Sequence, residues 1–334
     1  MTAERKIIVI TPIKNEEWIL ETFLKTTLQY ADHVLIADQY STDKSVEIAS
    51  NFKNVDVIIN DSKDYDEAYR QKLLINTARE RYGKGNIILA IDSDEILNFD
   101  ALNSSEWETI KQSEPGTVLY FEKPTYYGGT EKVIRYDSSG GWPLGFVDDN
   151  SEHCPKHIHS TRVPVKKDSP KLFLKDIKFL HCNLLSLPRQ RSKIRYYCML
   201  EAKLKTKTWI RRVWQYNKDY DYAKEGDGLD QANSAWVKGW VNQGISIAPD
   251  KEAKYYWYDL EALKLLDNST SRFSFWTEDV WDVDWNDVAK YFSYELKKGI
   301  NRPPKYFLGI KRILYKITCS ALALKNKAHK KQKK

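Results

Sequence analysis

The chain has 334 residues, of which 42% are hydrophobic, so its length and composition fit a globular protein and exclude a disordered one. Its formal charge of +7 belongs to the C-terminal end, because residues 301–334 contain eleven lysines and arginines and no acid, which leaves −4 for the rest. An acidic body with a basic tail argues against a nucleic-acid-binding protein.

The first 121 residues alternate between short apolar runs and amphipathic segments. The β-branched apolar runs predict buried strands, and apolar residues at helical spacing predict helices. We expect strands over 6–11, 33–37, 55–59, 86–91 and 118–121, with helices after Asn15, after Ser41 and over 66–82. This alternation predicts a parallel sheet with helices on both faces. From residue 124 to about 187 we expect irregular strands and loops, and from 189 to about 298 mainly helices.

An acidic tetrad, Asp92-Ser93-Asp94-Glu95, follows the fourth predicted strand. Carboxylates at the end of a buried strand are costly unless a cation or ligand uses them. Hard divalent cations prefer such oxygens and keep positions free for phosphates. Because polar residues also follow the first two strands, at Thr11 to Asn15 and at Asp38, the sequence predicts a metal and diphosphate site at the carboxyl edge of the sheet. The alternative is a strand-end turn with solvated acids.

Three segments in this order, TPIKNEE, IADQYSTDKS and AIDSDEIL, resemble the nucleotide-binding half of family 2 glycosyltransferases with a GT-A fold. The resemblance covers roughly Lys6 to Asp100. It implies an α/β fold, Rossmann-like, with a mostly parallel sheet flanked by helices and a mainly helical C-terminal region. It also implies an inverting, metal-dependent transfer of a sugar to a hydroxyl of a glycan or glycolipid. The expected donor is a nucleotide sugar, a UDP-sugar first, and the expected cation is Mn or Mg.

The resemblance implies that the first two motifs bind the base and ribose of the donor. The residues that match the base and ribose pocket are Thr11, Pro12, Asn15 and Glu16. Asp38 matches the acid of the second motif. Gln39 and Tyr40 stand where the family usually has an acid or Asn and then Gly, so the base contact is expected to pass to Gln39 and the shape of the loop is open.

The third motif places Asp92 and Ser93 against the donor and makes Asp92 and Asp94 the metal ligands. Glu95 continues a D-x-D-E variant found in relatives that act on surface polysaccharides and lipopolysaccharide. Arg70 matches a cation that faces the diphosphate, or it is a solvated helix arginine. His181 is expected either to complete the metal site or to contact a phosphate, the alternative being a structural histidine.

The catalytic base is expected among three acids downstream of the tetrad, with Asp149 ranked ahead of Asp148 and Glu152. The alternative for each of these three acids is a solvated side chain in a loop. A zinc site is a further interpretation, although its spacing matches no zinc pattern. Its ligands would come from His153, Cys154, His157, His159, His181 and Cys182.

These segments divide the chain into three parts. We expect a GT-A catalytic domain over 1–187, with its nucleotide-sugar half over 1–121, a helical acceptor-side region over 188–300, and a basic amphipathic tail over 301–334. One helical face of the tail would carry Ile310, Ile313, Leu314, Ile317, Ala321 and Leu324. With lysines around this face, the tail favours an anionic membrane surface over a merely solubilising role. Scattered cysteines, no signal-peptide pattern and no long apolar run predict a cytoplasmic protein, peripheral on the inner face of the membrane.

Two other functions stay open. The departures at Gln39, Tyr40 and Cys182 allow a non-catalytic, membrane-peripheral or carbohydrate-binding protein on a degenerate transferase fold. A nucleotidyltransferase ranks lower, because the loop after the first strand lacks the glycines that such enzymes usually have there.

Overall fold

The structure is a computed structural model of the chain. It describes residues 5–62, 66–134, 141–155, 160–205, 207–212, 215–216, 229–269, 275–276, 278–306, 309, 313, 316–317 and 320. The chain forms two compact units. The first comprises Met1–Leu185 and Leu229–Lys251, and the second comprises Ser186–Gly228 and Glu252–Lys334.

An 11-stranded mixed sheet is the centre of the first unit within the described residues. Its strands are β1 (Ile7–Ile13), β2 (His33–Asp38), β3 (Val55–Ile59), β4 (Ile87–Ala90), β5 (Glu95–Leu97), β6 (Val118–Glu122), β7 (Thr125–Tyr126), β8 (Lys132–Ile134), β9 (Trp142–Val147), β10 (Lys171–His181) and β11 (Leu229–Gln231). The order is β11-β8-β7-β10-β6-β9-β4-β1-β2-β3, and β5 pairs with β10 outside this path. Strands β1 to β4 are parallel, as the alternation predicted.

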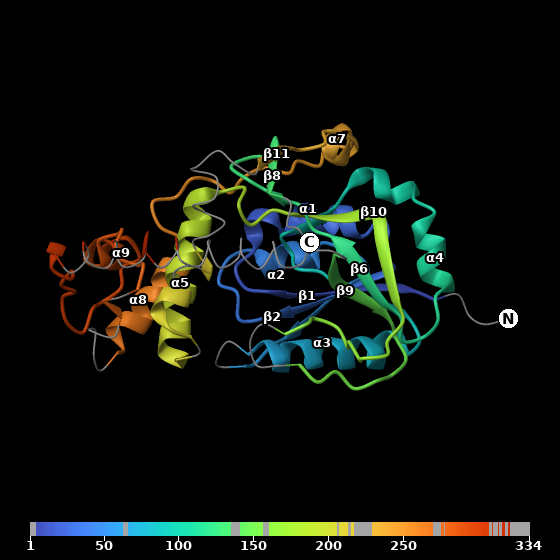
Figure 1. The fold of residues 1–334 in the computed structure, drawn as a ribbon, viewed down its shortest axis with the longest axis horizontal. Helices are drawn as coiled ribbons and strands as arrows, with labels where there is room; N and C mark the ends of the chain where they lie inside the picture. The colour runs from blue at the N-terminus through green and yellow to red at the C-terminus, as the bar shows by residue number, and fades with distance from the viewer. Residues whose placement is uncertain are drawn as a thin grey trace. The chain divides into compact units, whose positions relative to one another are not determined.

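Helices cover both faces of this sheet (Figure 1). They are α1 (Glu17–Thr27), α2 (Ser45–Ser50), α3 (Glu67–Tyr82), the 3-10 helix η1 (Phe99–Asn103) and α4 (Glu106–Gln112). Alternate strand residues point to opposite faces. Val9 and Leu89 pack with Phe23 of α1, whereas Ile8 and Ile88 pack with Leu74 of α3. The predicted fold class, an α/β fold with a mostly parallel sheet flanked by helices and a helical C-terminal region, is confirmed.

Strand β9 interrupts the parallel order in the middle of the sheet. β9 lies between β4 and β6 and is antiparallel to both. It therefore begins at the carboxyl edge of β4, near Trp142, and ends at the amino edge, where Val147 pairs with Ile87. This direction decides where the residues after β9 lie.

The segment Leu229–Lys251 completes the core of the first unit. Its helix α7 (Ala235–Asn242) buries Trp236 and Trp240, and the Trp240 indole donates to the carbonyl of Leu97 at 2.8 Å. A Cβ on Gly239 would lie 2.0 Å from the ring of Phe99, so only glycine allows α7 to approach η1 this closely.

The second unit contains α5 (Leu187–Leu204), α8 (Trp257–Asp267) and α9 (Trp285–Tyr291). Its apolar core includes Met199, Leu263 and Trp285. Arg195 of α5 is buried and pairs with the buried Asp259 of α8 at 2.7 Å. A buried charge pair of this kind is costly to break, so it fixes the two helices in one register.

The C-terminal tail is described only in part. Ile313 and Ile317 are helical and each is 61% exposed, whereas the other apolar residues of the predicted face lie outside the described residues. Among the helices described, none combines the length and apolar character that a membrane crossing requires.

Candidate functional site

The carboxyl ends of β1, β2 and β4 bring the predicted polar residues to one edge of the sheet. Asp38 ends β2 and lies opposite Ile13 of β1, and Ile91 donates to Ile10 of β1 just before Asp92. Asp38 and the tetrad therefore flank β1 on its two sides. Neighbouring strands are about 4.8 Å apart, so these acids are roughly two strand spacings apart.

The loops after β1 and β2 are tied together by side chains. Asn15 adopts a left-handed φ of 55° and its side-chain oxygen accepts the Thr42 amide at 2.7 Å, so it braces the second loop rather than capping α1. Glu16 stands at the N-cap of α1 and accepts the indole of Trp18 at 2.7 Å. Thr11 is fully buried, and Pro12 pairs with Ala37.

The loop after β2 contains a residue in the left-handed conformation, Tyr40, at the position where a glycine was expected. Tyr40 is 60% exposed and has a φ of 54°, a conformation that costs a non-glycine residue energy. Asp38 stabilises the turn by accepting the amide of Ser41, and the Gln39 side chain donates to the carbonyl of Ser62 at 3.2 Å. The loop thus keeps a left-handed residue at this point without the expected glycine.

Asp94 and His181 meet at the same edge. β5 pairs with β10 so that Glu95 lies opposite His181, and the Cys182 amide donates to the Asp94 carbonyl at 2.7 Å. His181 Nε2 lies 3.8 Å from Asp94 Oδ2, and its Nδ1 is 3.3 Å from the buried hydroxyl of Thr125. A second partner on the other ring nitrogen is the arrangement that orients a metal-binding imidazole.

The residues present fit a divalent cation. In the part of the chain that the structure describes, one group of metal-ligating side chains is found, made of Asp94, Glu95 and His181, with ligand atoms within 4.8 Å of one another. A carboxylate oxygen and an imidazole nitrogen suit Mn or Mg better than a soft metal.

Glu95 is buried and surrounded by positive charge. Lys123 Nζ lies 3.0 Å from its Oε1, and Arg162 lies 2.6 Å from its Oε2. Burial alone raises the pKa of Glu95, but the charges of Arg162 and Lys123 outweigh it and hold the pKa well below its usual range. Glu95 is therefore charged at any physiological pH.

Arg162 also pairs with Asp92, and Arg70 is nearby. Burial raises the pKa of Asp92, while the positive charges of Arg162 and Arg70 oppose the shift. Arg70 thus lies close enough to act on the tetrad, where the resemblance placed a cation. Ser93, between the two aspartates, is buried. Sequence reasoning missed Arg162 and Lys123, because neither belongs to a motif.

The acids predicted as the catalytic base do not join this group. The Asp148 amide donates to the Asn86 carbonyl, so Asp148 and Asp149 lie at the amino end of β4. The length of β4 alone separates them from the tetrad by at least about 10 Å. Asp148 is buried against Arg79 at 2.8 Å, and the exposed Glu152 lies 3.5 Å from Lys72. The role of each as a base stays a prediction.

Asp149 has a weakened basicity. Burial raises its pKa, but hydrogen bonds from Ser151 and Lys166 outweigh this and lower it. Lys166 Nζ lies 3.1 Å from Asp149 Oδ2.

The predicted zinc ligands that the structure describes do not lie together. His153 Nε2 lies 2.9 Å from the Gln71 side-chain oxygen, Cys154 is exposed, and the buried Cys182 thiol donates to the carbonyl of Leu180. Burial lowers the pKa of His153 to about 4, which keeps the ring neutral. His157 and His159 lie outside the described residues.

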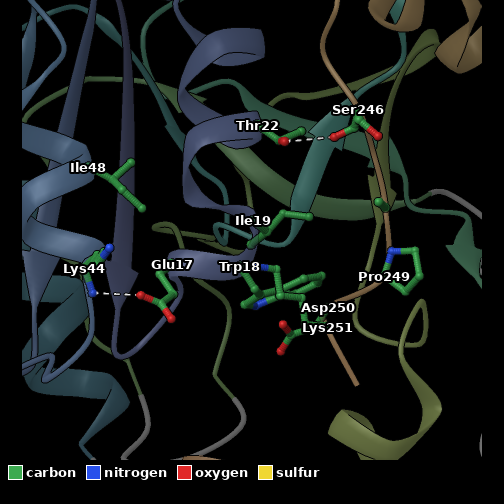
Figure 2. Close-up of a pocket in the computed structure, with 11 residues that line it drawn as sticks. Glu17, Trp18, Ile19, Thr22, Lys44, Ile48, Ser246, Pro249, Asp250 and Lys251 are labelled. Carbon is green, nitrogen blue, oxygen red and sulfur yellow. Dashed lines mark hydrogen bonds between the residues drawn. The ribbon is translucent and has the colours of Figure 1, made fainter. Parts of the chain in front are cut away.

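A separate cavity of about 440 Å³ lies between α1, α2 and the segment 246–251 (Figure 2). Trp18 lines it, and the Thr22 hydroxyl donates to the carbonyl of Ser246 at 2.9 Å across one side. Its lining includes none of the acids of the tetrad.

Residues 8–105 match the family model described as Glycosyl transferase family 2. The match runs from β1 to Ser105, two residues after the end of η1, and contains all three motifs. This part of the chain is therefore similar to family 2 glycosyltransferase domains, and the predicted enzyme class, a glycosyltransferase, is confirmed. No curated protein matches the chain at a significant level.

Solved structures with some likeness include glucosyl-3-phosphoglycerate synthase from Mycobacterium tuberculosis in complex with Mn2+, uridine diphosphate and glucosyl-3-phosphoglycerate. It is 20% identical, the match covers 37% of this chain and 45% of that one, and the TM-score is 0.27. A second is 4-diphosphocytidyl-2C-methyl-D-erythritol synthase, at 16% identity, 43% and 74% coverage and a TM-score of 0.29. The chain thus spans less than half of the first enzyme, and likenesses this weak identify neither substrate nor metal.

Proposed function

We propose that the protein is an inverting glycosyltransferase that uses a nucleotide-diphosphate sugar, a UDP-sugar first, and Mn or Mg, and glycosylates a hydroxyl of a glycan or lipid-linked glycan. The observation that carries the proposal is the approach of His181 Nε2 to Asp94 Oδ2 at the strand edge where Asp38 also ends β2. The D-x-D-E sequence supports the surface-polysaccharide and lipopolysaccharide subgroup.

Two neighbouring groups of residues would bind the two parts of the donor, the nucleoside and the diphosphate. The segment Thr11 to Glu16 and the pair Asp38 and Gln39 hold the base and ribose, because they end β1 and β2. Asp94 and His181 hold the cation at the end of β4, and Arg70 adds positive charge beside Asp92. A cation bound there supplies positive charge next to the departing nucleoside diphosphate.

The acceptor side follows from the strand order. Beyond β4 come β9 and β6, and the exposed Trp142 begins β9 at the same edge as the tetrad. The acceptor hydroxyl would approach from this side, and a carboxylate must take its proton. The exposed apolar residues Ile313 and Ile317 support a tail that meets a membrane, where lipid-linked acceptors lie.

The test is a panel of nucleotide sugars screened by thermal shift and by release of nucleoside diphosphate, each with Mn2+ and with EDTA. We expect one donor to stabilise the protein and to be consumed only with the metal. Asp94→Asn should lower turnover at least 100-fold, whereas Asp168→Asn, an exposed acid outside the site, should leave it unchanged. Equal turnover by Asp94→Asn and wild type would refute the proposal, and donor binding without any turnover would favour a degenerate transferase fold.

A further inference from the structure

Arg162 engages two of the three carboxylates of the tetrad at once. One terminal nitrogen, Nη1, donates to Glu95 Oε2 at 2.6 Å and to the Ala90 carbonyl at 3.2 Å. The other, Nη2, donates to Glu95 Oε1 at 3.0 Å and to Asp92 Oδ2. A guanidinium fits this role because its donors form a rigid fork.

Glu95 has its acceptor capacity filled by these contacts. Oε1 accepts from Lys123 and Arg162, and Oε2 accepts from Arg162 and from the Asp92 amide at 3.0 Å. A carboxylate offers about four lone-pair positions, so four donors occupy them all. Glu95 therefore lies near the cation position but has its oxygens committed to protein donors.

We propose that Arg162 is a positioning residue that holds Glu95 out of the cation's coordination shell and ties one oxygen of Asp92, so that Asp94 and His181 provide the protein ligands. The same guanidinium, 24% exposed, offsets the negative charge of the tetrad where the diphosphate has to bind. The inference rests on the proposed function only in assuming that a cation binds at this edge.

Two opposite changes in affinity follow from this arrangement. Without Arg162, the tetrad is one charge more negative and Glu95 has oxygens to offer, so a divalent cation should bind more tightly. The diphosphate loses a nearby positive charge and should bind more weakly. At the short distances involved, one charge changes each affinity by about tenfold.

The experiment measures Mn2+ alone, by the electron paramagnetic resonance signal of free Mn2+, and UDP alone, by calorimetry with EDTA, on the full-length protein. We expect Arg162→Met to bind Mn2+ about tenfold more tightly and UDP about tenfold more weakly. Partial unfolding would weaken the binding of both Mn2+ and UDP, so it cannot produce these two opposite shifts in affinity. Arg81→Met is the matched control, because Arg81 pairs with Asp56 in an exposed ion pair at 2.9 Å; it should change neither affinity.

Two further variants keep the test decisive if Arg162→Met folds poorly. The double variant Arg162→Met/Glu95→Gln has the net charge of the wild type, and its Mn2+ affinity should return to within about threefold of the wild-type value. Arg162→Lys keeps the charge but not the fork, and its Mn2+ affinity should lie between those of wild type and Arg162→Met.

Unchanged or weaker Mn2+ binding by Arg162→Met, or by Arg162→Lys if the first variant does not fold, overturns the inference. A wild-type protein that binds no Mn2+ overturns both this inference and the metal dependence of the proposed function. A wild type that binds Mn2+ and shows the expected shifts but consumes no nucleotide sugar supports the inference and overturns the proposed function alone.

Discussion

His181 Nε2 lies 3.8 Å from Asp94 Oδ2, although Asp94 directly precedes β5 and His181 ends β10, far along the chain. The antiparallel pairing of β5 with β10 sets this approach, because it places Glu95 opposite His181 and Asp94 beside Cys182. The imidazole reaches the acid through sheet geometry, and Thr125 orients its other nitrogen. The first prediction tests that orientation.

Thr125→Val should weaken Mn2+ binding about tenfold without changing the fold, because it removes the hydroxyl beside His181 Nδ1 and keeps the shape of the buried side chain. The same titration of free Mn2+ measures it. Thr109→Val, on the exposed side of α4, is the matched control. Equal Mn2+ affinity in Thr125→Val and wild type would mean that the hydroxyl does not support the ring.

Asp148→Asn should destabilise the protein by about 3–5 kcal/mol, because it leaves the nearly buried Arg79 without its charge partner. Urea unfolding followed by fluorescence measures the change. Asp149→Asn, which breaks an exposed contact with Lys166, should cost less than about 1 kcal/mol. A stable Asp148→Asn protein that has lost sugar transfer would instead support Asp148 as the catalytic base.

The stability of the protein should fall between about pH 7 and pH 5 partly through His153. Its folded pKa of about 4 is below the ordinary 6.5, so the unfolded chain binds the proton more readily in this range. The contribution of His153 is complete above the unfolded pKa and is lost as the pH falls toward 4. His153→Gln should lose roughly 1–2 kcal/mol less than wild type between pH 7 and pH 5. Parallel pH profiles of the two proteins would contradict this expectation.

Gly239→Ala should destabilise the first unit by about 1–3 kcal/mol, because the new methyl group would overlap the ring of Phe99. Gly309, which is also helical but has open space around it, provides the control. Gly309→Ala should be neutral or slightly stabilising. Thermal unfolding distinguishes the two, and similar melting temperatures would show that η1 yields to the added carbon.

The tail prediction is tested with vesicles that contain anionic phospholipid. Ile313→Glu/Ile317→Glu should reduce cosedimentation at least tenfold, because it places charges on the apolar face that would enter the interface. Val241→Glu changes an equally exposed apolar residue, 60% exposed, on α7 and should bind as wild type does. If the double variant still binds the vesicles, the lysines of the tail alone would account for membrane binding.

The sequence predicted the strands of the first half closely, because buried parallel strands are continuous apolar runs. The run 55–59 is β3, and the run 86–91 contains β4. The edge that carries Asp38 and Asp94 followed from the general rule for parallel sheets. His181 was reachable in the same way, because it also follows an apolar run.

The direction of β9 was not predictable from its residues. The residues of a short run such as Trp142–Val147 fit a parallel and an antiparallel strand equally well. Because β9 is antiparallel to β4, Asp148 lies at the amino edge of β4. Arg162 and Lys123 escaped prediction for a related reason: their positions depend on tertiary packing in a region without helical or strand periodicity. Tyr40 adopts a left-handed conformation although it is not a glycine, so the conformation of this loop did not follow from its residue type.

The chain leaves the first unit after Leu185 and returns to it at Leu229, and α7 then fills part of its core. A fragment that stops at the first exit would lack Trp236 and Trp240, and would leave a hole beside η1. An independently expressed transferase half needs both stretches joined by a short linker. For the same reason, exchanging the second unit between relatives requires Ser186–Gly228 and Glu252–Lys334 to be replaced together, because Arg195 of α5 pairs with Asp259 of α8.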